Sequence, residues 1–354
     1  MAYTTINKHT DYFNTKLYTG NNSTNNITGV GFQPDFLWIK DRSTTGESHH
    51  LMDIVRGNNK FIHTNSTAVE RTGSLNTAYN TFAFASDGFN ITNTSGLNDE
   101  TNLTGRNYAS WNWKANGTGV SNTDGSITST VSANTTAGFS IVKYTGNGST
   151  NQTVGHGLGV APAFIIYKGI DAVHNWLAYH QSLGATKGIF PNLTQAAVTS
   201  SSYFDDTAPT TSVFSVTTTS GADQTNINTE DYIAYCFAEK KGYSKFGSWI
   251  GNGNADGPFV YTGFKPEFVI LKNASGTNQW LMFDNVREPF NIMGTYLEPN
   301  SDAAEANFDG FDFLSNGMKM RTSDGGWNTS GSTYIYMAFG QSLVGSNNVP
   351  CTAR

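Results

Sequence analysis

The sequence predicts an all-β fold, made of three related antiparallel β-sandwich units of jelly-roll type in tandem. The first observation behind this prediction is a threefold repeat of Pro, one variable residue, Phe, a short apolar run and Lys. Pro suits the entry of a strand, where one ladder hydrogen bond can be spared, and the apolar run is too short for a buried helix. The copies are Pro34-Asp-Phe-Leu-Trp-Ile-Lys40, Pro162-Ala-Phe-Ile-Ile-Tyr-Lys168 and Pro266-Glu-Phe-Val-Ile-Leu-Lys272.

The second observation is a common order of segments after each copy. A polar loop comes first, and a second apolar run returns at residues 50–55, 175–179 and 279–283. Strand, variable turn and strand in succession are typical of a hairpin in an antiparallel sheet. Each unit then closes with an aromatic strand at a similar distance from its proline. These closing strands cover residues 108–113, 232–237 and 334–339.

Composition agrees with this class and excludes several functions. A chain of 354 residues is long for one core, and its charged fraction of 14% is well below the usual quarter. The net charge of −6 argues against a nucleic-acid partner, because phosphate binding needs clustered Lys and Arg. We expect no membrane insertion, because no apolar run is long enough to span a bilayer. Residues 1–9 lack the apolar core of a signal peptide, and the two cysteines, Cys236 and Cys351, are too few for a disulfide framework.

The repeat also predicts where the units begin and end. Residues 116–137 consist mainly of Gly, Ser, Thr and Asn, which favours a linker. Unit 2 matches the other two only loosely, so it is the divergent copy. The predicted organisation is an N-terminal arm (1–10), unit 1 (11–115), the linker (116–137), unit 2 (138–241), unit 3 (242–343) and a C-terminal tail (344–354).

Acidic and basic residues recur with the repeat and suggest two alternative roles. A glycosidase would use an Asp and a Glu as a paired nucleophile and acid. A structural interpretation makes Asp-x-x-Arg a turn-bracing ion pair, with the Glu as a second acceptor for the guanidinium. We favour the structural role and predict no enzymatic activity, because two units carry the set and an enzyme usually needs one site. The two sets are Asp53, Arg56 and Glu70, and Asp284, Arg287 and Glu305.

Histidines and one Asn/Asp-rich loop are the candidates for metal sites. Neither histidine group has the short spacing that presets a metal site, so we predict no metal and no cofactor. Residues 251–257 resemble a calcium loop in composition but lack its closing Glu, which favours a turn. The histidine groups are His49, His50 and His63 in unit 1, and His156, His174 and His180 in unit 2.

Aromatic side chains are the remaining candidates for binding. A flat apolar ring stacks on a sugar, while Asn and Asp bond its hydroxyls. Most tryptophans lie in predicted strands, where packing is the expected role. Trp327 lies in the Gly-rich turn at residues 323–331, and we predict it as the exposed contact for a glycan or a protein partner.

Several longer motifs resemble a known group of proteins. They include Trp280-Leu-Met-Phe-Asp-Asn-Val-Arg287, Asp312-Phe-Leu-Ser-Asn-Gly-Met-Lys-Met-Arg321 and the closing Pro350-Cys-Thr-Ala-Arg354. As a set they are similar to repeat units of virion structural and tail-fibre-like proteins of tailed bacteriophages, especially marine ones. The resemblance covers repeats one and three closely and repeat two loosely. It implies a structural role in the virion and supplies no catalytic residues.

The expected function is therefore that of a phage tail fibre or appendage protein, assembled in the host cytoplasm. It would display loops to a host-surface glycan, and many copies would make weak contacts strong. Its partners would be other virion proteins and copies of itself, with a trimer implied by the resemblance. One alternative is a capsid decoration or tail-adaptor protein that binds only virion proteins. The other is a polysaccharide-degrading enzyme that uses Asp284 and Glu305.

Overall fold

The computed structural model describes residues 3–73, 81–92, 101–218 and 225–345. Within these ranges the helical elements are one 3-10 turn, η1 (His9–Asp11), and one short helix, α1 (Gly325–Asn328). The strands of the three large sheets pair antiparallel. The predicted all-β antiparallel class is therefore confirmed.

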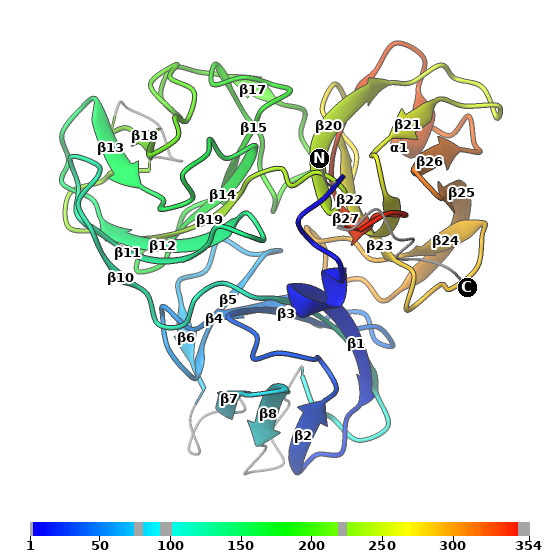
Figure 1. Ribbon diagram of the computed structural model, residues 1–354, viewed down its shortest axis with the longest axis horizontal. Coiled ribbons are helices and arrows are strands. Elements are labelled where there is room, and N and C mark those ends of the chain that lie inside the picture. Colours follow the sequence, from blue (N-terminus) through cyan, green and yellow to red (C-terminus); the bar gives the residue numbers. More distant parts are fainter. Residues whose placement is uncertain (1–2, 74–80, 93–100, 219–224, 346–354) are drawn as a thin grey trace.

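Three large sheets contain the same order of four strands. Figure 1 shows them as three lobes around a common centre, which we call lobes 1, 2 and 3 in chain order. In lobe 1 the four strands are β1 (Phe13–Thr19), β9 (Asn107–Trp113), β3 (Phe36–Asp41) and β4 (His50–Asp53). In lobe 2 they are β12 (Phe139–Thr145), β19 (Asp231–Phe237), β14 (Phe164–Gly169) and β15 (Leu177–His180). In lobe 3 they are β20 (Ser244–Ile250), β27 (Thr333–Gln341), β22 (Lys265–Asn273) and β23 (Trp280–Asp284).

The register of these sheets relates the lobes residue by residue. The first Phe of each repeated motif faces an aromatic residue of the closing strand: Phe36 faces Trp113, Phe164 faces Phe237 and Phe268 faces Phe339. The repeated prolines therefore enter equivalent strands. Pro266 differs in lying inside β22, where the register shifts between Pro266 and Phe268.

Smaller sheets cover the outer face of each large sheet. Lobe 1 has β2 (Thr24–Thr28), β8 (Gly88–Thr92) and β7 (Thr81–Ala85), and its large sheet is extended by β5 (Lys60–His63) and β6 (Arg71–Thr72). Lobe 2 has β13 (Gln152–Gly155) paired with β18 (Val213–Val216), and the pair of β16 (Lys187–Gly188) and β17 (Val198–Thr199) lies beside the edge strand β15, to which Ile189 bridges at Ala178. Lobe 3 has β21 (Phe259–Tyr261), β26 (Gly317–Met320), β25 (Ala306–Leu314) and β24 (Met293–Tyr296).

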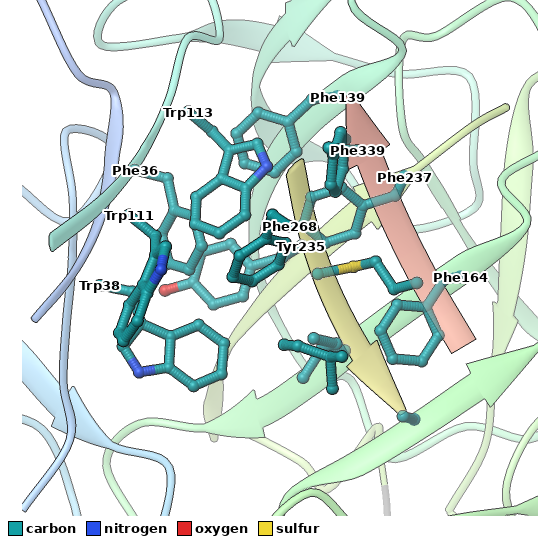
Figure 2. Packing of buried hydrophobic residues seen from close by; sticks show 14 of the residues in the cluster. Phe36, Trp38, Trp111, Trp113, Phe139, Phe164, Tyr235, Phe237, Phe268 and Phe339 are labelled. Atoms are coloured by element: carbon teal, nitrogen blue, oxygen red, sulfur yellow. The ribbon is translucent and has the colours of Figure 1, made fainter. Parts of the chain in front are cut away.

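Each large sheet is buried on both faces, which explains the continuous apolar runs in the sequence. In β3, Phe36 and Trp38 belong to a central cluster, while Leu37 and Ile39 belong to a separate cluster under the covering sheet. Alternate residues of a strand point to opposite faces, so both faces need apolar side chains. The central cluster draws residues from all three lobes. Figure 2 shows rings from all three lobes packed against one another in this cluster.

The segment predicted as a linker, residues 116–137, is not one. It contains β10 (Val120–Asn122) and β11 (Ser129–Asn134), and β11 pairs with β12 along the edge of the second large sheet. The prediction was wrong because uncharged Ser and Thr are common both in linkers and in edge strands. Val131 lies in this segment and is buried in the core of lobe 2.

The N-terminal arm packs against lobe 3. Ile6 is buried in the central cluster, and the Tyr3 hydroxyl donates to the carbonyl of Gly263 at 2.6 Å. The backbone N–H of His9 donates to Gln341 Oε1 at 2.9 Å. Most of the predicted C-terminal tail, including Cys351, lies outside the described residues. Cys236 is buried in the core of lobe 2, as expected for a small apolar side chain.

We expect Phe268→Ala to destabilise the whole molecule by about 3–5 kcal/mol, since it opens a cavity in the core that the lobes share. Its ring lies 5.2 Å from that of Phe13 and 5.5 Å from that of Trp113, both in lobe 1. Urea unfolding followed by tryptophan fluorescence would measure the loss as a shift of one transition. Phe290→Ala is the control, because that ring is 78% exposed. Independent unfolding of one lobe in the variant would contradict the shared core.

Candidate functional site

The three lobes meet through one set of contacts that is repeated around a pseudo-threefold axis. The loops that carry these contacts, here called the axial loops, are residues 63–70, 190–197 and 298–305. In each loop an Asn side-chain oxygen accepts the backbone N–H at the start of the second hairpin strand. The pairs are His49 N–H to Asn65 at 3.1 Å, Trp176 N–H to Asn192 at 3.0 Å and Trp280 N–H to Asn300 at 2.9 Å.

The side chains at these same hairpin positions reach the axial loop of the neighbouring lobe. Trp176 Nε1 donates to the carbonyl of His63, and Trp280 Nε1 donates to that of Phe190, both at 2.9 Å. His49 takes the equivalent place and lies 3.0 Å from the carbonyl of Glu298. Its other ring nitrogen accepts from Trp38 Nε1 at 2.9 Å, so Nε2 carries the proton. The three contacts run in one direction around the axis and close the ring of lobes.

The repeated lysines complete the set. Lys40, Lys168 and Lys272 are buried, and each donates to a carbonyl of its own lobe and to one in the neighbouring axial loop. The neighbouring acceptors are Asp302 at 3.5 Å, Thr67 at 3.1 Å and Thr194 at 3.1 Å, respectively. Burial lowers the pKa of Lys168 and of Lys272 to about 8.

An open hollow lies where the axial loops meet, and we call it the axial mouth. Its volume is about 400 Å³. Among the described lining residues, all side chains except that of Leu193 are polar, and one of them, Asp302, is charged. It consists of Asn65, Asn192, Leu193, Thr194, Gln279, Asn300, Ser301 and Asp302.

The opposite end of the axis is covered by the N-terminal arm. Along β27, Ile335 pairs with Lys272, which lies at the mouth, whereas Gln341 pairs with Lys265 at the far end of the strand. The arm contacts Gln341 through His9. Thr4 and Ser342 both lie against Gly242, so the two ends of the described chain lie together, away from the mouth.

The predicted Asp, Arg and Glu sets form two ion-pair clusters of the same geometry. In lobe 3, Arg287 Nε donates to Asp284 at 2.5 Å, and Arg287 Nη1 donates to Glu305 at 3.0 Å. The set in lobe 1, Asp53, Arg56 and Glu70, has the equivalent distances of 2.5 and 3.3 Å. Burial opposes the charge on Arg56, but the nearby Asp53 raises its pKa, so the guanidinium remains protonated.

Each aspartate of these clusters also accepts a hydrogen bond from another lobe. Tyr235 donates to Asp53 at 2.8 Å, and Trp111 Nε1 donates to Asp284 at 3.0 Å. Both carboxylates are fully buried. Protein donors therefore occupy the oxygens that a glycosidase would present to a sugar, and this geometry favours the structural interpretation.

The described part of lobe 2 lacks the Asp, Arg and Glu cluster. The interface between lobes 2 and 3 explains why. The residue equivalent to Tyr235 and Trp111 in lobe 3 is Met337, which has no side-chain N–H or O–H to donate. Lobe 2 places His180 where the aspartates stand, and its Nε2 lies 3.2 Å from the carbonyl of Tyr336. His180 Nδ1 accepts from the N–H of Ser182 at 3.2 Å, so Nε2 is the donor. Lobe 2 therefore has a hydrogen-bond donor, His180, where the other lobes have an acceptor, because the facing group in lobe 3 is a backbone carbonyl and not a side-chain N–H or O–H.

The other histidines are not gathered into a metal site. His50 and His63 face each other at 3.2 Å, but His49 points to the axis instead. His156 lies against the carbonyl of Thr210, and His174 against Glu230. Across the described ranges, no group of three or more His, Cys, Asp or Glu residues could hold a metal ion.

Trp327 is not the exposed contact that the sequence predicted. Its side chain is only 4% exposed and packs against Phe283, with ring centroids 5.0 Å apart. Asp324 caps helix α1 by accepting the N–H of Gly326, and this turn folds the ring back onto β25. Gly310 leaves the space for it, because a Cβ there would lie 2.2 Å from the ring. The prediction was wrong because a Gly-rich turn can fold its side chains inwards.

Sequence reasoning also missed the asparagines that organise the lobes. Residues 251–257 form an irregular turn around Asn328, whose Nδ2 donates to Asn252 Oδ1 and to the carbonyl of Asn254, both at 2.8 Å. Asn102 and Asn226 hold the equivalent turns of the other lobes. The signal was present, because each stands six residues before the Tyr at the second position of its closing strand: Tyr108, Tyr232 or Tyr334.

Residues 8–342 match the family described as a domain of unknown function, DUF7483. The chain belongs to this family. The match covers all three lobes at once, so the family's domain is the whole three-lobed ring. No curated protein matches the chain, and no solved structure matches it. In the described part of the chain, no helix is long and apolar enough to cross a membrane.

We expect acid to weaken the interface between lobes 2 and 3 through His180. Burial lowers the pKa of His180 to about 4, below the value near 6.5 of an unfolded chain. The unfolded state therefore binds the proton first, and stability is lost as pH falls below 6.5. The loss would reach about 2–3 kcal/mol by pH 4.5. Urea unfolding at pH 7 and pH 4.5 measures it, and His180→Gln should lose less between the two. Equal losses would contradict this role.

We expect Trp111→Phe to cost more than Trp113→Phe, although both remove a fully buried indole from strand β9. Trp111 donates to Asp284, whereas Trp113 Nε1 has no hydrogen-bond partner among the described residues. The difference reports the hydrogen bond to a buried carboxylate, about 1.5–3 kcal/mol, together with any change in the contact of Arg287 with the Trp111 ring, 5.5 Å from its centroid. Chemical denaturation of the two variants would measure it. Equal costs would show that the contact between the lobes adds nothing.

Proposed function

We propose that this chain is a structural protein of a bacteriophage particle, in a tail fibre or another appendage that meets a host-surface glycan through the axial mouth. The observation that carries this proposal is the difference between the two ends of the axis. Three equivalent loops leave an open polar hollow at one end, while the arm covers the other. A protein attached near its chain ends would present the mouth outwards.

The chemistry of the mouth suits a hydroxyl-rich ligand. Side-chain amides, hydroxyls and one carboxylate line it beside Leu193, and such polar groups donate to and accept from sugar hydroxyls. No aromatic ring is among its described lining residues, so a single mouth would bind weakly. Many copies in one particle would turn this into firm attachment. The trimer expected from the resemblance would carry three such mouths.

A rigid display role also agrees with how the charged residues are used. The acidic and basic sets that could have served catalysis are engaged in contacts between the lobes. A second candidate is a capsid decoration or tail-adaptor protein that binds only virion proteins. It is favoured by the exposed rings of lobe 3, of which Phe290 is 78% exposed.

We expect Asp302→Trp to reduce glycan binding at least tenfold by filling the mouth, while the fold persists because the Asp302 side chain is exposed. A panel of bacterial surface polysaccharides, probed with the protein displayed on multivalent beads, would measure this. Val160→Trp is the matched control, since Val160 is 40% exposed and precedes Pro162, at the end of β14 away from the mouth.

If Asp302→Trp and the wild type bound polysaccharide equally well, the axial mouth would not be the glycan-binding site. No binding to any polysaccharide would favour the adaptor role instead. Electron microscopy of intact particles with labelled protein would then distinguish an appendage from the capsid shell.

A further inference from the structure

One side of lobe 3 exposes apolar residues beside two strand edges that are unpaired within the described chain. Strand β20 ends its large sheet, and β21 ends the covering sheet. Ile250 is 57% exposed, Phe259 47% and Tyr261 56%, while Val260 between the last two is buried. A hollow of about 360 Å³ lies at one end of this side, between Tyr3, Lys245 and Tyr261. We call this surface the open side of lobe 3.

Lobe 2 shows how the equivalent side is covered. Phe139 faces Phe237 as Ser244 faces Phe339, so β12 corresponds to β20. Strand β13 follows β12 and pairs with the strand before the closing one, as β21 does in lobe 3. In lobe 2, β11 pairs along β12, and Ile127 bridges to Val154 in β13. One extended segment of the chain thus closes both edges.

Part of the β20 edge is already occupied and part is open. The N–H of Phe246 donates to Glu239, and its carbonyl accepts from Gln181, so side chains of lobe 2 take this position. The backbone N–H and C=O groups of alternate residues point to the same side of a strand. Ser248 and Ile250 therefore point these groups outwards, as Phe246 does. Along the described chain, no strand pairs with β20 on this side. Unpaired edges next to exposed apolar side chains are sites for strand addition.

We propose that the open side of lobe 3 binds an extended segment of a different protein chain, which adds as a strand beside Ser248 and Ile250. The structure specifies the chemistry of that segment through its counterpart in lobe 2. There the covering strands are uncharged and rich in Ser and Thr, and Ile127 and Val131 supply buried apolar anchors. The segment would place such an anchor against Phe259 and Tyr261. A second copy of this chain does not supply it, because its own residues 118–134 are engaged in lobe 2.

A fluorescent peptide of residues 119–134 serves as the probe, since it carries the covering sequence itself. We expect it to bind the full-length protein in an anisotropy titration. Ser248→Pro removes one edge N–H, and Ile250→Ser with Tyr261→Ser removes the apolar contacts, so each variant should bind at least tenfold more weakly. Phe290→Ser is the control for general loss of exposed apolar surface and should bind as the wild type does. Thermal unfolding of each variant checks that the fold is intact.

Three outcomes would overturn the proposal. The wild type could fail to bind the peptide at millimolar concentration. Binding could persist unchanged in Ser248→Pro and in the Ile250/Tyr261 variant, which would place the peptide elsewhere, for example by exchange with β11 in lobe 2. Sedimentation could also show a dimer of the wild type that Ser248→Pro abolishes, which would make a second copy the occupant. The proposal does not depend on glycan binding at the mouth, so Asp302→Trp should leave peptide binding unchanged.

Discussion

The shared central core is the constraint on which the rest of the structure depends. Within the described chain, the inner faces of the three large sheets cover one another, and their rings meet in one cluster (Figure 2). Phe13 contacts Trp113 of its own lobe and also Phe268 and Phe339 of lobe 3. Removing any lobe would expose the apolar faces of the other two. This explains why a single family match extends over the whole ring rather than over one repeat.

Because the three sheets share one core, buried polar groups at the ends of their strands find hydrogen-bond partners in neighbouring lobes. A buried polar group without a partner costs about 1–3 kcal/mol, and an unpaired charge costs more. The lysine that ends each repeated sequence motif illustrates the solution, since it donates to carbonyls on both sides of an interface. The Asp-x-x-Arg sets do the same with carboxylates. Charge at these places fixes how the lobes dock.

The sequence predicted those features of the fold and the site that depend on residues close together in the chain. Features that depend on residues far apart in the chain could not be predicted. The Pro-x-Phe motif and the aromatic closing strands predicted the all-β class, because strand period and apolar runs are read over a few residues. The ion pair of Asp284 and Arg287 was predictable for the same reason, being three residues apart. The axial mouth was not, since Asn65, Asn192 and Asn300 meet only after the ring closes. Trp327 was misplaced because a distant glycine, Gly310, makes room for its ring.

Departures from the threefold pattern are informative because the pattern itself is structural. His180 and Met337 depart together, which marks them as two halves of one contact. Residues 116–137 depart by adding two strands to lobe 2 that the described part of lobe 3 lacks. Packing alone gives no reason to leave the equivalent side of lobe 3 open, since exposed Ile250 and Tyr261 raise the risk of aggregation. Strands β1 and β2 of lobe 1 also end their sheets, but the exposed apolar residues Ile250, Phe259 and Tyr261 lie beside the edges of lobe 3. This combination of open edges and apolar side chains is suited to meeting another protein.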